Sequence, residues 1–361
     1  VYDSVLLRHG DDDWTWWLDL HHLVTDAMSQ ALVHRLTSLA YEGDDIEAAS
    51  FADLADEQTA PDRDAEVDVH AVRERATAAT TSPLRPFGGR GPVTTSSTRR
   101  PLTIDEVDAA ELAAAVNGAY PSISPDLSLA AVFAAALACT MQRLDGRSEF
   151  TVGMPVGNRS DRRRRYLVGP LMELHPVRVA IEDGDTFASL VERTLTAVID
   201  MLRVTRRDPT AQRGDFEMVV NVFRGDYDTF ASHPVSVSWV RAPHVDPAHS
   251  VRVHAFDYGN GMELEIDVND ALGTEATPAR LDRLVGRVVA AMLAHPDAPI
   301  AAVAITTDQD REELAALNPA AVTITDDRPV HERIRDRLHA KTEWVVAEDL
   351  SLIHISEPTR P

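Results

Sequence analysis

The stretch Asp19-Leu20-His21-His22-Leu23-Val24-Thr25-Asp26-Ala27 decides the fold, because it joins a predicted strand to a predicted helix. In the residues before it, apolar and other side chains alternate with the period of two that is typical of a half-buried strand. After it, apolar residues recur at helical spacing, with Thr25 or Asp26 placed to cap the helix and Gly43 to end it. The two histidines are therefore predicted to lie on a rigid strand-to-helix turn.

Adjacent strand residues point to opposite faces, so His21 and His22 cannot share one role. We expect one imidazole to face a cavity and the other to face the packed interior. Imidazole is the side chain best suited to moving a proton near neutral pH. Asp26, four residues after His22, either orients that ring or pairs with a distant arginine. The plain alternative is that both histidines are hydrogen-bonded residues at a strand end.

Length and composition favour a globular cytoplasmic protein. A chain of 361 residues is long enough for two lobes that each bury a core, and 44% hydrophobic and 26% charged residues are ordinary for a soluble protein. The formal charge of −23 argues against nucleic acid and against an anionic membrane as partners. No run of residues is predicted to span a membrane. Cys139 is the only cysteine, so no intrachain disulfide forms, and its apolar surroundings predict a core residue.

The rest of the chain alternates helical and strand patterns. The residues that open the chain, 1–8, are strand-rich, and residues 80–100, rich in proline and glycine, are predicted to form a loop crossing between the lobes. Helices are predicted at 70–79, at 103–116 with Thr103 or Asp105 as the start signal, and at 129–144, 186–202 and 277–293. Strands are predicted at 150–156 and 216–223, and as an antiparallel series at 235–240, 251–256 and 262–268.

The segment from His21 to Ala27 resembles the HHxxxDG signature of nonribosomal peptide synthetase condensation domains, with Ala27 in place of the glycine. Other segments match that family in its own order. Residues 151–159 resemble its TPVxNR strand end, and residues 169–178 resemble GFFVNTLxxR, keeping Gly169 and Arg178 but with Glu173-Leu174-His175 as a departure. Residues 216–223 resemble FQVLFNYQ and keep Asn221, and residues 297–314 resemble the family's ending.

This resemblance implies a fold and a domain order. The fold is α/β (α+β), the two-lobed chloramphenicol-acetyltransferase-like arrangement of mixed sheets flanked by helices, with a truncated N-terminal lobe. Residues 1–100 would be the remainder of that lobe with the crossover, and residues 101–315 the C-terminal lobe. Residues 316–349 would be a linker and the start of an adenylation domain, because Pro329-Val330-His331-Glu332 looks like its first residues. Residues 350–361 resemble the translation of a sequencing adapter, and we exclude them from the fold.

The resemblance also implies a function. Condensation domains form an amide bond between two acyl groups carried on the 4′-phosphopantetheine arms of carrier proteins, with no cofactor and no metal bound by the domain itself. His22 is the expected catalytic residue, as a general base or as a group that positions the amine, and His21 and Ala27 complete the motif. Asp26 is expected to pair with Arg159 and to be structural. Gly169 and Asn221 are substrate-tunnel candidates. The implied partners are the upstream and downstream peptidyl carrier domains and the adjacent adenylation domain.

Several alternatives remain open from sequence. The same fold hosts epimerising and ester-forming members, and a degenerate condensation-like module could serve as a docking platform for a partner enzyme. A glycerolipid-type acyltransferase with His21 and Asp26 as its acid–base pair would need a membrane-facing apolar segment, and a metal hydrolase would need more ligands at suitable spacing. The arginine run at residues 162–165 is either a solvated loop or a site that meets the phosphate of a carrier arm.

Overall fold

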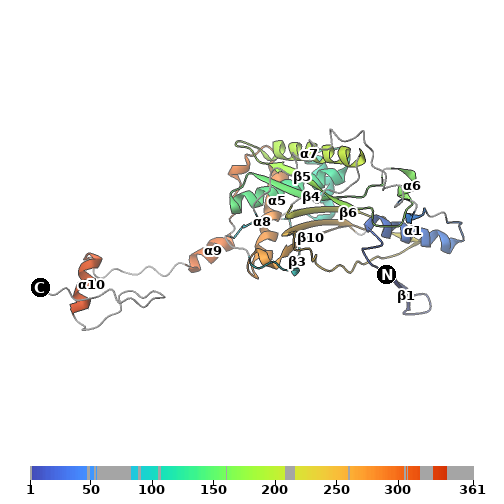
Figure 1. The fold of residues 1–361 in the computed structure, drawn as a ribbon, viewed down its shortest axis with the longest axis horizontal. Coiled ribbons are helices and arrows are strands. Elements are labelled where there is room, and N and C mark those ends of the chain that lie inside the picture. Colours follow the sequence, from blue (N-terminus) through green and yellow to red (C-terminus); the bar gives the residue numbers. More distant parts are fainter. Residues whose placement is uncertain are drawn as a thin grey trace. The chain divides into compact units, whose positions relative to one another are not determined.

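The computed structural model describes residues 2–46, 49–52, 54, 83–87, 91–104, 107–159, 161–207, 216–258, 261–304, 306, 308–317 and 328–339. The chain divides into two compact units, Val1–Ile305 and Thr306–Pro361. The larger unit contains a six-stranded sheet (Figure 1). The helix predicted at 70–79 and the adapter-like residues 350–361 lie outside the described residues.

The six-stranded sheet is mixed. Its order is β3-β10-β9-β6-β4-β5, in which β4 pairs with β6 and β6 with β9 in parallel, and the other neighbours pair antiparallel. The strands are β3 (Ser97–Pro101), β4 (Glu149–Val156), β5 (Glu173–Ala180), β6 (Met218–Arg224), β9 (Val251–Asp257) and β10 (Met262–Asn269). A mixed sheet flanked by helices is the fold class that the sequence predicts.

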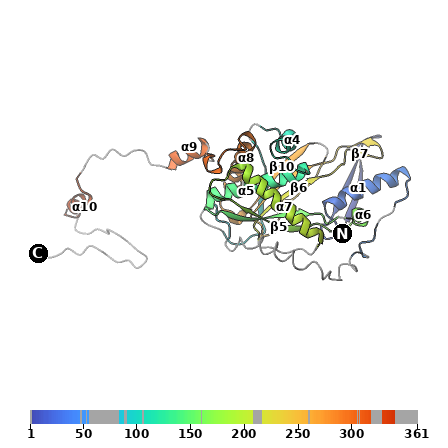
Figure 2. The same cartoon turned by 90° about the horizontal axis from the view of Figure 1, so that it is seen from above.

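Four helices and one face of this sheet form the core. They are α4 (Ala109–Ala119), α5 (Pro125–Asp145), α7 (Phe187–Arg207) and α8 (Thr277–Ala294), and α5 packs against the other three (Figure 2). The facing strand residues alternate, as on β10, where Met262, Leu264, Ile266 and Val268 all join the core. By length and composition α5 could cross a membrane, but 72% of its most apolar window is buried inside the protein. Cys139 on α5 is confirmed as a core residue, and burial raises the pKa of its thiol to about 12.

The opposite face of the sheet is polar and carries a strap, which we define as residues 235–250. On β10, Glu263, Glu265 and Asp267 alternate with the core residues and lie on this polar face. The strand predicted at 235–240 is wrong, because these residues form no ladder with any described strand. Between β6 and the strap lie two strands of two residues each, β7 (Thr229–Phe230) and β8 (His233–Pro234), which pair with each other.

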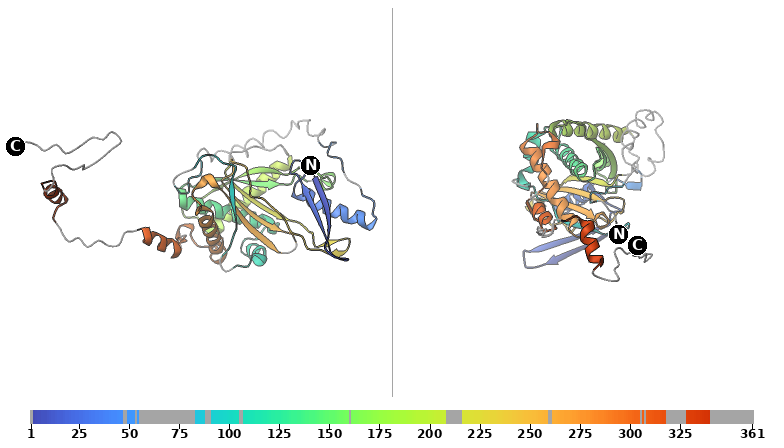
Figure 3. Two further views of the ribbon diagram at one scale, coloured as in Figure 1. Left: turned by 90° about the horizontal axis from the view of Figure 1, so that it is seen from below. Right: turned by 90° about the vertical axis from the view of Figure 1, so that its left-hand side faces the viewer.

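The N-terminal elements follow the prediction closely. β1 (Tyr2–Arg8) and β2 (Trp14–Leu20) form an antiparallel hairpin, drawn in blue beside α1 (Ala27–Glu42) in Figure 3. Asp26 caps α1 by accepting a hydrogen bond from the Ser29 amide, and Gly43 ends it in the left-handed conformation at φ 88°. Burial alternates at Trp16, Leu18 and Leu20 as predicted, but Trp14 is half exposed because β2 pairs with β1 alone among the described strands.

Element boundaries differ from the sequence prediction where tertiary contacts decide them. The helix expected from 103 begins at Ala109, after Asp108 as its cap, because Leu102 and Ile104 are buried in extended chain that continues β3. β3 itself lies in the segment predicted as a loop and pairs with β10. The helix predicted from 129 starts earlier, with Pro125 in its first turn. The shorter elements are α6 (Arg162–Arg165), α9 (Asp308–Leu317), α10 (Val330–His339) and the 3₁₀ turns Asp270–Leu272 and Ile300–Ala302.

Candidate active site

The turn that carries the two histidines is exposed. The Nδ1 atom of His21 accepts a hydrogen bond from the Leu23 amide at 3.1 Å, and its carbonyl accepts one from Val24 at 3.0 Å. His21 and His22 are both exposed, so the expectation that one ring faces the packed interior is wrong. The reason is that the strand ends at Leu20, and the turn begins before any neighbouring layer covers these side chains.

Asp26, in contrast, is buried with every lone pair engaged. It is 1% exposed. One carboxylate oxygen accepts hydrogen bonds from the Ser29 amide at 2.7 Å and from Arg159 Nη2 at 2.9 Å. The other accepts from the backbone amides of Leu171 and Met172 at 2.9 and 3.0 Å. The residue is therefore both the helix cap and an ion-pair partner of Arg159, which the sequence left as alternatives.

Arg159 and Ser29 connect the start of α1 to the loop after β4. The Arg159 side chain is 6% exposed, and its Nη1 donates to the carbonyls of Arg164 and Leu167 at 2.8 and 2.5 Å. Ser29 Oγ accepts from Arg159 Nη2 at 2.7 Å and from the Gly169 amide at 3.0 Å, and it donates to the Gly169 carbonyl at 2.7 Å. The structure thus brings Asp26, Arg159 and Gly169 together. Ser29 was not predicted, because a serine in the first turn of a helix carries no signal of its own in the sequence.

At two motif positions the local structure decides whether a side chain is tolerated. At Gly169, a Cβ atom would lie 2.2 Å from the ring of Phe51, so a side chain does not fit there without a rearrangement. At Ala27, the backbone is the first turn of α1, and the described non-glycine residues with positive φ are Asn158, Ala231 and Ser232. Alanine therefore suits the position at which the family pattern has glycine.

Asn221 lies on β6, which pairs in parallel with β4, the strand that leads to Arg159. It is a partly exposed residue of β6, directly opposite His254 of β9 in the parallel register. Adjacent strand residues in register share a face, so Asn221 belongs to the polar face of the sheet. The structure brings Asn221 next to His254, and not into the hydrogen-bonded cluster around Asp26.

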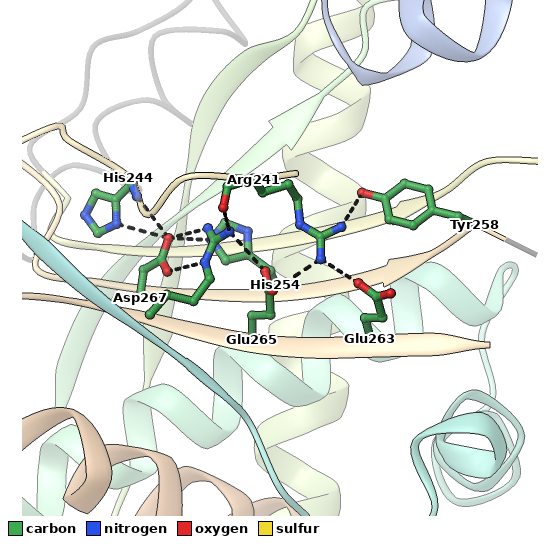
Figure 4. A network of polar contacts seen from close by, with 8 residues as sticks. Arg241, His244, His254, Tyr258, Glu263, Glu265 and Asp267 are labelled. Atoms are coloured by element: carbon green, nitrogen blue, oxygen red, sulfur yellow. Dashed lines mark hydrogen bonds and ion pairs between the residues drawn. The ribbon is translucent and has the colours of Figure 1, made fainter. Parts of the chain in front are cut away.

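A buried polar network on that face was not predicted from sequence (Figure 4). Asp267 is 0% exposed and accepts two hydrogen bonds of 2.7 Å from Arg99, one of 3.1 Å from the His244 amide and one of 3.3 Å from His254 Nε2. Burial opposes ionisation of Asp267, but the hydrogen bonds from His244, His254 and Arg99 outweigh it and hold the pKa of the carboxyl well below its usual range. Asp267 is therefore a fixed negative charge.

Arg241 fastens the strap to the same network. Its guanidinium lies 4.5 Å from the ring centroid of Phe256 and donates to Tyr258 Oη at 3.0 Å and to Glu263 at 2.5 Å. Trp239 stacks on Tyr258 at 4.6 Å between ring centroids. These contacts replace the backbone ladder that the strap lacks. Within the part of the chain that the structure describes, no three His, Cys, Asp or Glu side chains are grouped so as to hold a metal ion.

Comparison with known proteins identifies the family. The family model named Condensation domain matches residues 123–315, more than half of the chain. The chain belongs to the condensation domain family. Isonitrile lipopeptide synthase of Streptomyces coeruleorubidus is 26% identical over 316 residues, which are 81% of this chain and 21% of that protein. Phosphinothricin tripeptide synthetase PhsC of Streptomyces viridochromogenes is 26% identical over 384 residues, which are 97% of this chain and 34% of that protein.

Solved structures show the same fold. The condensation domain of Monacolin K polyketide synthase MokA aligns with a TM-score of 0.68 at 16% identity, over 82% of this chain and 73% of that one. The first condensation domain of the calcium-dependent antibiotic synthetase, bound to a substrate analogue, aligns with a TM-score of 0.60 at 20% identity, over 85% and 70%. This condensation domain chain therefore spans most of a solved domain, but only 21% and 34% of the two curated synthetases.

Proposed function

We propose that this condensation domain forms an amide bond between a donor acyl or peptidyl thioester and the amine of an acceptor aminoacyl thioester. Family membership supports the reaction type. The observation that carries the proposal is the buried ion pair between Asp26 and Arg159. Asp26 lies four residues after the exposed His22, so this pair fixes one end of the turn that carries His22. A buried carboxylate with both oxygens hydrogen-bonded holds the end of this turn rigidly, and a rigid support suits a reactive group.

The reaction transfers one proton from the amine to the departing sulfur, and we assign His22 a role in that transfer. The acceptor nitrogen attacks the thioester carbonyl carbon, a C–N bond forms, and the C–S bond breaks to release the donor thiol. The amine loses a proton in this exchange, and the departing sulfur gains one. His22 either carries that proton or holds the amine in line for attack by a hydrogen bond. Asn221 and His254 lie on the polar face of the sheet, and we keep Asn221 as a candidate contact for the substrate.

The partners follow from the same proposal. The donor and acceptor would arrive on the 4′-phosphopantetheine arms of an upstream and a downstream peptidyl carrier domain. An adenylation domain would begin within residues 316–349, where α10 starts at Val330 of the Pro329-Val330-His331-Glu332 segment. Such an assembly would work in the cytoplasm. The relatives support multidomain partners, because this chain corresponds to 21% and 34% of their lengths.

Substitution of His22 tests the proposal. We expect His22→Ala to lower single-turnover amide formation from two loaded carrier proteins by roughly 10²- to 10⁴-fold, the range for a positioned acid–base group. His21→Ala is the matched control, since it removes only the hydrogen bond to the Leu23 amide and should cost about 1 kcal/mol of stability.

A folded His22→Ala protein that turns over at the wild-type rate would refute the catalytic role of this residue. Wild-type protein that is folded but forms no amide would favour the docking alternative. The X-domain of teicoplanin biosynthesis, solved in complex with OxyB, has a related fold, with a TM-score of 0.63 at 18% identity.

A further inference from the structure

A group of arginines interrupts the acidic surface of this chain. Four consecutive arginines form the one-turn helix α6, Arg162–Arg165, in a protein of formal charge −23. Arg162 and Arg165 are exposed and, three residues apart on a helical turn, are neighbours. Arg35 of α1 is also exposed, and its guanidinium lies 5.9 Å from the ring centroid of Tyr166, the residue after α6. We call Arg35, Arg162 and Arg165 the arginine patch.

The arginine patch is tied to the turn that carries His22. Arg159 donates from Nη1 to the carbonyls of Arg164 and Leu167, on either side of Tyr166, and from Nη2 to Asp26. One buried side chain therefore joins α6 to the cap of α1, and α6 is drawn beside α1 in both Figure 1 and Figure 2. His22 lies four residues before Asp26, so the two Cα atoms are at most about 14 Å apart even in fully extended chain.

Charge limits what this surface attracts. A net charge of −23 repels anions at long range, and a local cluster of arginines opposes that repulsion where an anion would approach. A guanidinium presents a planar fork of donors that matches phosphate oxygens in two hydrogen bonds. Arg164 is left out of the patch because it already pairs with Asp161 at 3.3 Å.

We propose that the arginine patch binds the phosphate of the phosphopantetheine arm that presents a thioester to His22. This inference rests on the proposed function, since it assumes that the substrate arrives on such an arm. The patch holds the phosphate end beside α6, and the flexible remainder of the arm carries the thioester to the turn at His21 and His22. A patch that only solubilises the loop would not distinguish substrates with a phosphate from substrates without one.

The test compares two forms of each thioester. One form carries the acyl group on 4′-phosphopantetheine, and the other carries the same group on N-acetylcysteamine, which has no phosphate. Arg162→Gln with Arg165→Gln should raise KM for one phosphopantetheinyl substrate, donor or acceptor, by about fivefold to tenfold at unchanged kcat, as expected for exposed charge-assisted contacts. KM for the N-acetylcysteamine form should not change, and the effect should shrink as salt rises.

A matched control has the same change of charge. Arg203→Gln with Arg311→Gln removes two other surface arginines whose side chains are 71% and 60% exposed, and it should leave KM for both forms unchanged. The proposal is overturned if the patch variant raises KM equally for both forms, if it raises KM for neither, or if the control variant has the same effect.

The same design separates this inference from the proposed function. Wild-type activity on two N-acetylcysteamine thioesters tests the amide-forming reaction without any phosphate. If that reaction fails, binding of 4′-phosphopantetheine itself, measured by calorimetry, still tests the patch. Weaker binding to the Arg162→Gln, Arg165→Gln variant than to wild type would support the proposal, and equal binding would overturn it.

Discussion

Asp26 has two roles at once, because a carboxylate has room for several donors. Its first oxygen takes the Ser29 amide and Arg159, and its second takes the amides of Leu171 and Met172. Asp26→Ala would leave the Arg159 guanidinium buried without its counter-charge. Removing one partner of a buried pair typically costs about 3–5 kcal/mol, against about 1 kcal/mol for a cap alone. We expect a loss of at least 3 kcal/mol in urea unfolding, with reduced activity as a consequence.

A double-mutant cycle between Asp26→Ala and Arg159→Ala separates the ion pair from the cap. The buried pair should show a coupling energy of about 1–3 kcal/mol. The pair between Asp161 and Arg164 is a control from the same loop, since its side chains are 53% and 23% exposed, and its coupling should stay below about 1 kcal/mol. Coupling near zero between Asp26 and Arg159 would mean that Asp26 acts only as a cap.

The residues of this cluster were accessible to sequence analysis to different degrees. Asp26, Arg159 and Gly169 belong to motifs that follow one another in a known order, and the ion pair between the first two was expected. Ser29 was not found, because a serine in a first helical turn is unremarkable until its hydroxyl is seen on Gly169 and Arg159. The exposure of His21 and His22 could not be predicted, since burial depends on what covers a turn in space.

At the scale of elements, helices and strands were predicted correctly where apolar residues recur with a clear period. β9, β10, α5 and α8 lie close to where alternation or helical spacing predicted them. β3 has arginines and a proline, and its backbone is a strand only because β10 pairs with it. The strap shows the reverse case. Its alternating valines suggest a strand, but the Arg241 and Trp239 side chains, and no backbone ladder, hold it to the sheet.

The attachment of the strap should depend on pH through His249. This ring stacks on Phe216 at 5.2 Å, and its Nδ1 accepts a hydrogen bond from Arg252 at 2.5 Å. Burial, and then the positive charge of Arg252, lower the pKa of His249 to about 4, although Asp246 opposes the shift. Burial also lowers the pKa of His254, which packs against Phe256 and bonds to Asp267.

The sign of the effect follows from proton uptake. Both histidines bind protons more readily in the unfolded chain, where the pKa is near 6.5, so each contributes stability that is lost as the pH falls below about 6.5, for His249 down to about 4. His249 alone should account for about 3 kcal/mol across this interval. We expect the urea midpoint to fall as the pH is lowered from 7 to 4.5, and His249→Gln to flatten that slope. His331→Gln on α10 changes an exposed histidine and should leave the slope as it is; an identical slope in the His249 variant would contradict the assignment.

At the scale of the larger unit, one sheet separates two kinds of environment. The helices α4, α5, α7 and α8 bury one face as the hydrophobic core, which provides the stability. The other face carries the strap and its charged network, and an aromatic cluster of Tyr227, Phe256 and Tyr258 against which Ala31 of α1 packs. The aromatic cluster therefore connects α1, which begins directly after the turn with His22, to the face of the sheet that carries the strap.

The last buried side chains mark the C-terminal end of the larger unit. Ile300 is 5% exposed and its amide donates to the Asp185 carbonyl at 2.9 Å, and Arg143 donates to the carbonyls of Ala301 and Val303. In α9 no described residue is buried, and Leu314 and Leu317 are 62% and 81% exposed. Burial of a large apolar side chain is the main source of stability at the end of a folded unit, so we expect the cooperative unit to end soon after Ile300, although the family model extends to residue 315.

Two truncations test where the cooperative unit ends. A chain of residues 1–305 should melt within about 2 °C of the full chain, because it keeps Ile300 and the carbonyls that Arg143 binds. A chain of residues 1–298 loses the buried Ile300, a loss of about 2–3 kcal/mol, and should melt about 3–5 °C lower. Calorimetry of the three chains gives both values. If residues 1–305 melted as low as the shorter chain, α9 and the residues after it would be part of the cooperative unit, and its C-terminal limit would lie beyond residue 305.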